Sequence, residues 1–224
     1  MLKRKLLNIT LSVAAAVFLT QLATSSPAGA IAYDREAALA YANTYSCNTG
    51  YCRNSYYWDF GGTDCTNFVS QAVYAGGQAM RSTSPYWNYV NNPVYGYLDT
   101  YSTSWVNVAA FKQFFVNATG RAVILAADKT AAYNPSSIGD VYMYDWGKGE
   151  GYSHLGFASG AGLYSTFTDP ATGIAYSDIN GGRGDWNNQH STDRKRAPWN
   201  WGYQTEPNQI YRSNSKIVII HFVN

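Results

Sequence analysis

The chain has 224 residues, with 16 Lys and Arg against 14 Asp and Glu, three His and three Cys. This length suits one or two domains and is enough to bury a core without metals or many disulfides. Three Cys without a Cys-x-x-Cys pair exclude a zinc ribbon and a disulfide-dense scaffold. The near balance of charge and the lack of a long basic run argue against a nucleic-acid-binding protein.

The first 30 residues have the layout of a secretory signal peptide. Residues 3–5 are basic, an apolar stretch follows over 6–19, and Ala28-Gly29-Ala30 gives a small-residue cleavage pattern. The alternative is a membrane anchor, but the apolar stretch falls short of the ~20 residues that span a bilayer. We therefore expect cleavage near Ala30 and a secreted mature chain, 31–224, that forms one domain and does not bind a membrane.

Secretion permits disulfides. Cys47 and Cys52 are four residues apart across a Gly-containing loop, and this spacing predicts a bridge between them. Cys65 is then left over, and an unpaired thiol in a secreted protein indicates a reactive residue.

Helices are expected first along the domain. Apolar spacing predicts a helix over 34–45 with Asp34 as its N-cap, and a second helix over 65–74 with Asp64 as its N-cap. The segment 81–103 is rich in Ser, Asn, Pro and Tyr and is expected to form a long loop. A third helix is predicted over 105–116.

Strands are expected in the second half, where the apolar period changes to two. The patterns predict strands over 141–145 and 154–159, weaker ones over 176–180 and 187–191, and a clear one over 216–223. Helices followed by strands are typical of an α+β domain with an antiparallel sheet.

The predicted second helix places Cys65 in its first turn. Exposed backbone N–H groups and the positive helix end favour a thiolate there, and a thiolate is the nucleophile for amide cleavage. The alternative is a buried structural cysteine. A histidine base is also needed. His154 opens an apolar strand and can face a helix end, whereas His221 lies within the last strand and is expected to be structural. A Cys followed by a His and then a polar residue is the chain order of papain-like enzymes.

At this point the sequence resembles a known family. The octet Asp-Cys-Thr-Asn-Phe-Val-Ser-Gln over 64–71 looks like the signature of the secreted bacterial "putative amidase domain" family. Gly-Asp-Val over 139–141, His154 and the segment 189–194 match further parts of its pattern. This family is similar to the CHAP and NlpC-type cysteine amidases and endopeptidases. The resemblance implies a papain-like fold, with N-terminal helices packed on a small antiparallel sheet.

The resemblance also implies roles for single residues. Cys65 would be the nucleophile and His154 the general base, with a third polar residue on the next strand to orient the imidazole. His190 is the first choice for that position, and Gln189 is the second. Two further candidates precede them: Asp178 and Asn180.

The oxyanion would be held by the backbone N–H of Cys65 and by a side chain. Tyr57 is a candidate donor because its segment must pass near Cys65, and its alternative role is packing. No metal and no organic cofactor are expected.

The function predicted from these residues is a secreted bacterial cysteine amidase or peptidase. Its expected substrate is a peptide or amide in cell-wall peptidoglycan, and a monomer is expected. One alternative is a silent wall-binding or toxin module, favoured by the surplus of Tyr and Trp. Another is an acyl transferase that uses the same thioester intermediate.

Overall fold

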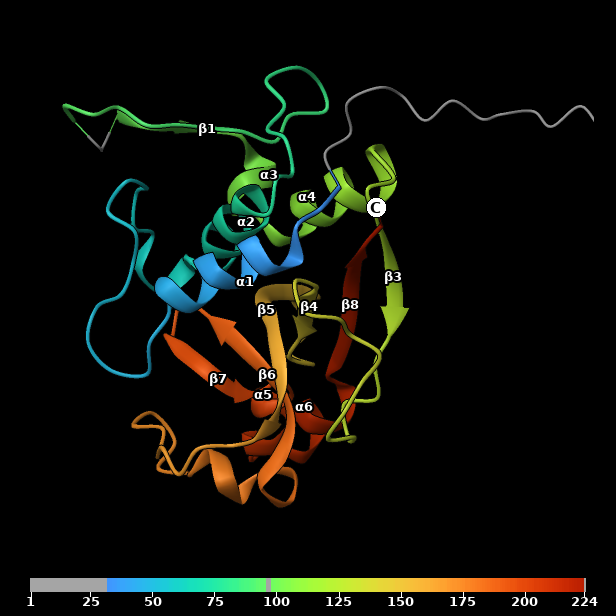
Figure 1. Cartoon of the computed structure of the whole chain (residues 1–224). Helices are drawn as coiled ribbons and strands as arrows, with labels where there is room; N and C mark the ends of the chain where they lie inside the picture. The colour runs from blue at the N-terminus through green and yellow to red at the C-terminus, as the bar shows by residue number, and fades with distance from the viewer. Residues whose placement is uncertain (1–31, 96–97, 224) are drawn as a thin grey trace, which may run out of the picture. The chain divides into compact units, whose positions relative to one another are not determined.

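The computed structural model describes residues 32–95 and 98–223, and a six-stranded sheet organises them (Figure 1). The strand order is β3-β8-β4-β5-β6-β7, and each neighbouring pair is antiparallel. The strands are β3 (Ala122–Ala126), β4 (Val141–Asp145), β5 (Tyr152–Leu163), β6 (Arg183–Gln189), β7 (Arg194–Pro198) and β8 (Lys216–Phe222). The predicted signal peptide and its cleavage site lie outside the described residues.

Helices from the first half of the domain pack against this sheet. The contacts of α1, α2 and α4 with β5 cover one side of it (Figure 1). The helical segments before the sheet are α1 (Arg35–Thr44), the 3₁₀ turn η1 (Gly61–Thr63), α2 (Cys65–Ala75), α3 (Thr103–Val106), α4 (Val108–Lys112) and the π-helical η3 (Gln113–Ala118). Two short helices, α5 (Trp201–Thr205) and α6 (Gln209–Asn214), follow β7.

The strands carry apolar side chains on both faces. On β4, Val141 and Met143 join the core beneath the helices, while Tyr142 and Tyr144 join a second cluster around Trp199. This division follows from the two-residue period of a strand, in which neighbouring side chains point to opposite faces. The sheet is therefore a buried layer, which holds β5 and β6 firmly beside α2.

The α+β class with an antiparallel sheet is confirmed, and so are five predicted elements. The helices expected over 34–45 and 65–74 correspond to α1 and α2. The strands expected over 141–145 and 216–223 correspond to β4 and β8, and the strand expected over 154–159 lies within β5. The weaker strand expected over 187–191 overlaps only the end of β6, at residues 187–189. The papain-like architecture stays a prediction.

Other expectations were wrong in detail. The helix predicted over 105–116 is interrupted at Asn107, whose backbone is extended and whose side chain caps α4 by accepting from the amide of Ala110. The strand predicted over 176–180 consists of two 3₁₀ turns, η4 (Tyr176–Asp178) and η5 (Asn180–Gly182). Gly181 there has a φ of 68°, which a strand does not accommodate.

Four strands were missed within the expected loops or between predicted elements. The segment 81–103 contains a small hairpin of β1 (Tyr89–Val90) and β2 (Thr100–Tyr101). β3 and β7 form the two edges of the large sheet. Edge strands contact one neighbour only, so their apolar pattern is weaker and harder to recognise.

Candidate active site

Cys65 is the first residue of α2 and lies in a cleft with His154. The thiol is almost fully buried, with 6% of the residue exposed. The cleft has a volume of about 610 Å³, and Thr66, Asn107 and Ser153 also line it. The structure therefore brings together the two residues that the sequence proposed as nucleophile and base.

The N-terminus of α2 is left open by its neighbours. Asp64 occupies the N-cap position, but its side chain does not cap the helix, contrary to expectation. Its carboxylate instead accepts hydrogen bonds from the Phe60 amide at 3.1 Å and from the Asn67 side chain at 2.8 Å. The first-turn N–H groups, which begin at Cys65, therefore remain available to an anion.

The electrostatic surroundings of Cys65 favour its thiolate. Burial raises the pKa of the thiol. A hydrogen bond with His154 and the charge of that ring lower the pKa, and the net result lies below the ordinary value of a cysteine. Hydrogen bonds from the Leu155 backbone and the Thr66 side chain act in the same direction, and the resulting pKa is about 7. A large share of Cys65 is thus thiolate near neutral pH, which is what a nucleophilic cysteine requires.

His154 begins the buried part of β5 and is itself 8% exposed. Its ring lies beside the stacked rings of Tyr144 and Trp146, with centroids 5.6 Å and 5.7 Å away. The Nε2 atom is buried and has no hydrogen-bond partner among the described residues. Nδ1 is therefore the nitrogen left to face the sulfur, and Nε2 needs a partner of its own.

A second unpaired polar atom, the side-chain oxygen of Asn187, lies on the neighbouring strand. The Asn187 amide nitrogen donates to Gln189 at 2.7 Å, whereas its Oδ1 atom is buried without a partner among the described residues. The amide lies directly over Gly156, where an added Cβ would meet Oδ1 at 2.2 Å. Gly156 and His154 share one face of β5, because they are two residues apart on a strand. The unpaired Nε2 atom of His154 and the unpaired Oδ1 atom of Asn187 thus lie on the same face of the sheet, two residues apart along β5.

His190, the first choice for the third position, is engaged elsewhere. Its Nδ1 atom lies 2.6 Å from Asp64 and its Nε2 atom lies 2.6 Å from the carbonyl oxygen of Tyr45. The ring also stacks on Phe68 with centroids 4.0 Å apart. Both nitrogens are therefore occupied, and neither is left to orient His154.

The other sequence candidates also have different surroundings. Gln189 lines a cavity with His154, but its amide bonds to Asn187 and to the Thr192 carbonyl. Asn180 bonds to Asn200 and lies in the 3₁₀ turn η5 rather than on the strand beside His154. Asp178 ends the neighbouring turn η4.

Tyr57 has the packing role that was its alternative. Its ring lies 4.9 Å from that of Tyr89 and stacks at 6.0 Å on Trp105. It is absent from the described residues that line the Cys65 cleft. Asn187 was not among the sequence candidates, because an amide without a charge or a motif gives no signal in a single sequence.

The loop before α2 is held by a disulfide and a cluster of charges. Cys47 and Cys52 are bonded to each other, and Cys65 is free. Arg53, the next residue, pairs with the carboxylate of Asp59 and lies 2.7 Å from that of Asp193 and 3.6 Å from that of Asp64. The loop is thereby joined both to the start of α2 and to the turn after β6.

A second cavity adjoins the Cys65 cleft. It has a volume of about 330 Å³ and shares Trp146, His154 and Ser191 with the cleft. The described residues contain no cluster of three or more His, Cys, Asp or Glu with the geometry to hold a metal. Among them, no helix combines the length and hydropathy needed to cross a bilayer.

Comparisons with known proteins identify the family. The model of a family described as "putative amidase domain" matches residues 32–212. The chain is also similar to the "Uncharacterized protein YjcM" of Bacillus subtilis (strain 168), with 34% identity over 116 residues. This match covers 51% of the chain but 23% of the relative, so the chain spans less than a quarter of that protein's length. No solved structure matches the chain.

Proposed function

We propose that this chain, which belongs to the "putative amidase domain" family of amide-bond hydrolases, uses Cys65 as its nucleophile and His154 as its base. The observation that carries the proposal is the Cys65 thiol, with a pKa of about 7, at the open N-terminus of α2 beside His154. Burial alone would raise that pKa, so the surroundings act against the burial effect. A structural cysteine needs no such compensation.

The first half of the reaction is acylation. The Cys65 thiolate attacks the carbonyl carbon, a C–S bond forms, and the carbonyl oxygen becomes an oxyanion beside the first-turn N–H groups of α2. When the C–N bond breaks, the protonated ring of His154 donates its proton to the departing amine nitrogen. The product is a thioester on Cys65.

The second half is hydrolysis of the thioester. His154 accepts a proton from a water molecule, the resulting hydroxide attacks the carbonyl carbon, and the C–S bond breaks to release a carboxylic acid and the Cys65 thiolate. We assign Asn187 as the orienting residue. An Nε2–H of His154 that donates to Asn187 Oδ1 would satisfy two buried atoms that otherwise lack partners. The same bond would hold Nδ1 toward the sulfur.

We further propose that the protein is secreted and that its substrate is an amide bond in the peptides of bacterial peptidoglycan. Support for secretion comes from the basic, apolar and small-residue order of residues 3–30. Support for a peptide substrate comes from the cleft of about 610 Å³ at Cys65 and the adjoining cavity of about 330 Å³, which together accommodate residues on both sides of a scissile bond.

The test is digestion of purified peptidoglycan, with released fragments identified by mass spectrometry. Three variants accompany the wild type: Cys65→Ala, His154→Ala and the control His221→Ala, which removes a histidine that pairs with Asp140 instead. We expect new amines and acids from the wild type and the control and none from the other two variants. Identification of the acyl product separates hydrolysis from acyl transfer, because a hydrolase releases a free carboxylic acid, whereas a transferase joins the acyl group to an amine acceptor in a new amide.

Equal release by Cys65→Ala and the wild type would exclude the cysteine mechanism. Binding to the wall by both proteins without any release would instead favour a silent wall-binding module. If the protein cleaves amide bonds in peptides that do not come from the wall but none in peptidoglycan, the cysteine mechanism would be supported and the proposed substrate would be wrong.

A further inference from the structure

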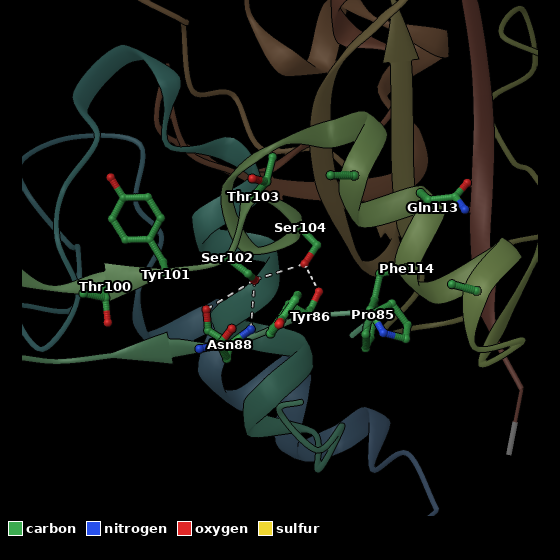
Figure 2. A pocket seen from close by; sticks show the side chains of 12 residues that line it. Pro85, Tyr86, Asn88, Thr100, Tyr101, Ser102, Thr103, Ser104, Gln113 and Phe114 are labelled. Atoms are coloured by element: carbon green, nitrogen blue, oxygen red, sulfur yellow. Dashed lines mark hydrogen bonds between the residues drawn. The ribbon is translucent and has the colours of Figure 1, made fainter. Parts of the chain in front are cut away.

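A further pocket, separate from the Cys65 cleft and from the cavity that adjoins it, lies between the β1–β2 hairpin and the helices that follow it (Figure 2). Its volume is about 560 Å³, within the range of small-molecule sites in proteins. Figure 2 shows its lining residues spread from Thr100 and Tyr101 on the hairpin to Gln113 and Phe114 on η3. None of the proposed catalytic residues lines it.

The lining has an uncommon chemical composition. Three aromatic rings contribute to it, those of Tyr86, Tyr101 and Phe114, and no described lining residue is charged. Tyr86 is 56% exposed and Tyr101 is 42% exposed, so both rings are accessible to a ligand. Such a surface suits a neutral molecule with an apolar face and disfavours an anion or a cation, which would lose hydration without a partner.

Polar side chains alternate with these rings. The side-chain amide of Asn88 and the hydroxyls of Thr100 and Thr103 make no hydrogen bond to any residue that the structure describes. They are therefore free to bond to a ligand with several hydroxyl or amide groups.

A chain of hydrogen bonds fixes the middle of the pocket. Ser102 Oγ accepts from the backbone N–H of Asn88 at 3.0 Å and lies 3.0 Å from Ser104 Oγ, which donates to the Tyr86 carbonyl (Figure 2). These bonds join the segments before and after the hairpin. The pocket is thus held in one shape before any ligand binds, which reduces the entropy lost on binding.

We propose that this pocket binds a neutral saccharide. Sugar rings combine an apolar C–H face, which packs on aromatic rings, with hydroxyl groups that bond to side chains such as those of Asn88, Thr100 and Thr103. The segment 103–110 connects this pocket with the Cys65 cleft, because its residues 103, 104 and 110 line the pocket and 106–109 line the cleft. The idea that the bound sugar and the cleaved peptide belong to one polymer rests on the proposed function. The proposal that the pocket binds a saccharide does not depend on it.

The test is isothermal titration calorimetry with chitotetraose, cellotetraose and a tetra-alanine peptide as probes. All proteins carry Cys65→Ala, so that binding is measured whether or not the protein is an enzyme. Tyr101→Ala removes a ring, and Ala118→Trp fills the pocket from an exposed position. Tyr133→Ala is the control, because Tyr133 is 50% exposed and does not line the pocket. Thermal unfolding verifies that each variant is folded.

We expect saturable binding of at least one tetrasaccharide, with a Kd that rises about fivefold or more in Tyr101→Ala and Ala118→Trp and is unchanged in Tyr133→Ala. The proposal is overturned if neither sugar binds up to millimolar concentration, or if both pocket variants bind as the background protein does. Binding of the peptide alone, weakened by the same two variants, would also overturn it and assign the pocket to a peptide.

Discussion

The Nδ1 atom of His190 lies 2.6 Å from the carboxylate of Asp64, the residue immediately before Cys65. Both side chains are buried, with 1% of His190 and 1% of Asp64 exposed. The other ring nitrogen faces the Tyr45 carbonyl, so the ring connects the end of α1 to the start of α2. The position of Cys65 therefore depends on a histidine outside its own cleft.

Replacement of His190 should destabilise the fold without removing the chemistry. His190→Ala leaves the Asp64 carboxylate buried without its ring partner, and removal of one member of a buried pair costs about 3 kcal/mol. Urea denaturation should show this loss in the free energy of unfolding. Protein that remains folded should keep a reactive Cys65, measured by alkylation with iodoacetamide.

His221→Ala is the control for this experiment. His221 is more exposed, and its partner Asp140 keeps the ion pair with Arg35 at 2.7 Å. Loss of peptidoglycan cleavage in His190→Ala with unchanged stability and thiol reactivity would contradict this interpretation and return His190 to the orienting role.

The contrast between His190 and Asn187 illustrates what a single sequence can predict. Cys65 and His154 were identified because a helix start and a strand start are local patterns, and the two residues carry recognisable chemistry. The residue that we assign to orient His154 depends on the register between β5 and β6, where Phe157 faces Asn188 and a bulge interrupts the pairing after Ala158. A sequence contains no information on that register that can be recognised without a structure.

The fold was predictable to a similar extent. The segments of β4 and β8 were recognised because most of their side chains are buried, which gives each an apolar run in the sequence. The helix over 105–116 was misjudged because the break at Asn107 arises from a side chain that caps the following helix. The preference of Asn for caps competes with the helical pattern on either side of it.

The disulfide should stabilise the loop that contains Arg53. Cys47→Ser combined with Cys52→Ser should lower the free energy of unfolding by roughly 2 kcal/mol, the value expected for a loop this short. Reduction of the wild type with dithiothreitol should lower its thermal midpoint by the same amount as the double variant. Dithiothreitol should not change the midpoint of the double variant. An unchanged midpoint in the reduced wild type would exclude a stabilising bridge.

The reactivity of Cys65 should depend on pH in a defined direction. Because its pKa is lowered to about 7, the thiolate forms as the pH rises through that value and is lost below it. The rate of alkylation by iodoacetamide should therefore reach half its plateau near pH 7. In His154→Ala the midpoint should move upward, because the hydrogen bond and the charge of His154 both lower the thiol pKa.

The same pH profile in His221→Ala should match that of the wild type, since His221 contacts Asp140 instead of Cys65. A midpoint above pH 8.5 in the wild type would mean that the thiol is not activated, because that is the ordinary value for a free cysteine. The proposed nucleophile would then lose its main support.

The last prediction concerns the contact of Asn187 with Gly156. Asn187→Ala removes the amide oxygen that we assign to His154, and Gly156→Ala introduces a methyl group 2.2 Å from the place of that oxygen. Each change should lower kcat for peptidoglycan cleavage by roughly a hundredfold, because a misplaced catalytic group costs about this much. Asn187→Asp keeps an acceptor at the same place and should retain more activity than Asn187→Ala. Thermal unfolding verifies that all variants are folded.

The double variant, Asn187→Ala with Gly156→Ala, shows whether the two single changes lower kcat through the same contact or independently. Without the Asn187 side chain, a methyl group at Gly156 no longer meets the amide, so the double variant should be no slower than Asn187→Ala alone. Such non-additivity is the signature of two residues that act through one contact. If the two losses multiply instead, Gly156 and Asn187 act independently, and the position of the amide over Gly156 has no part in orienting His154.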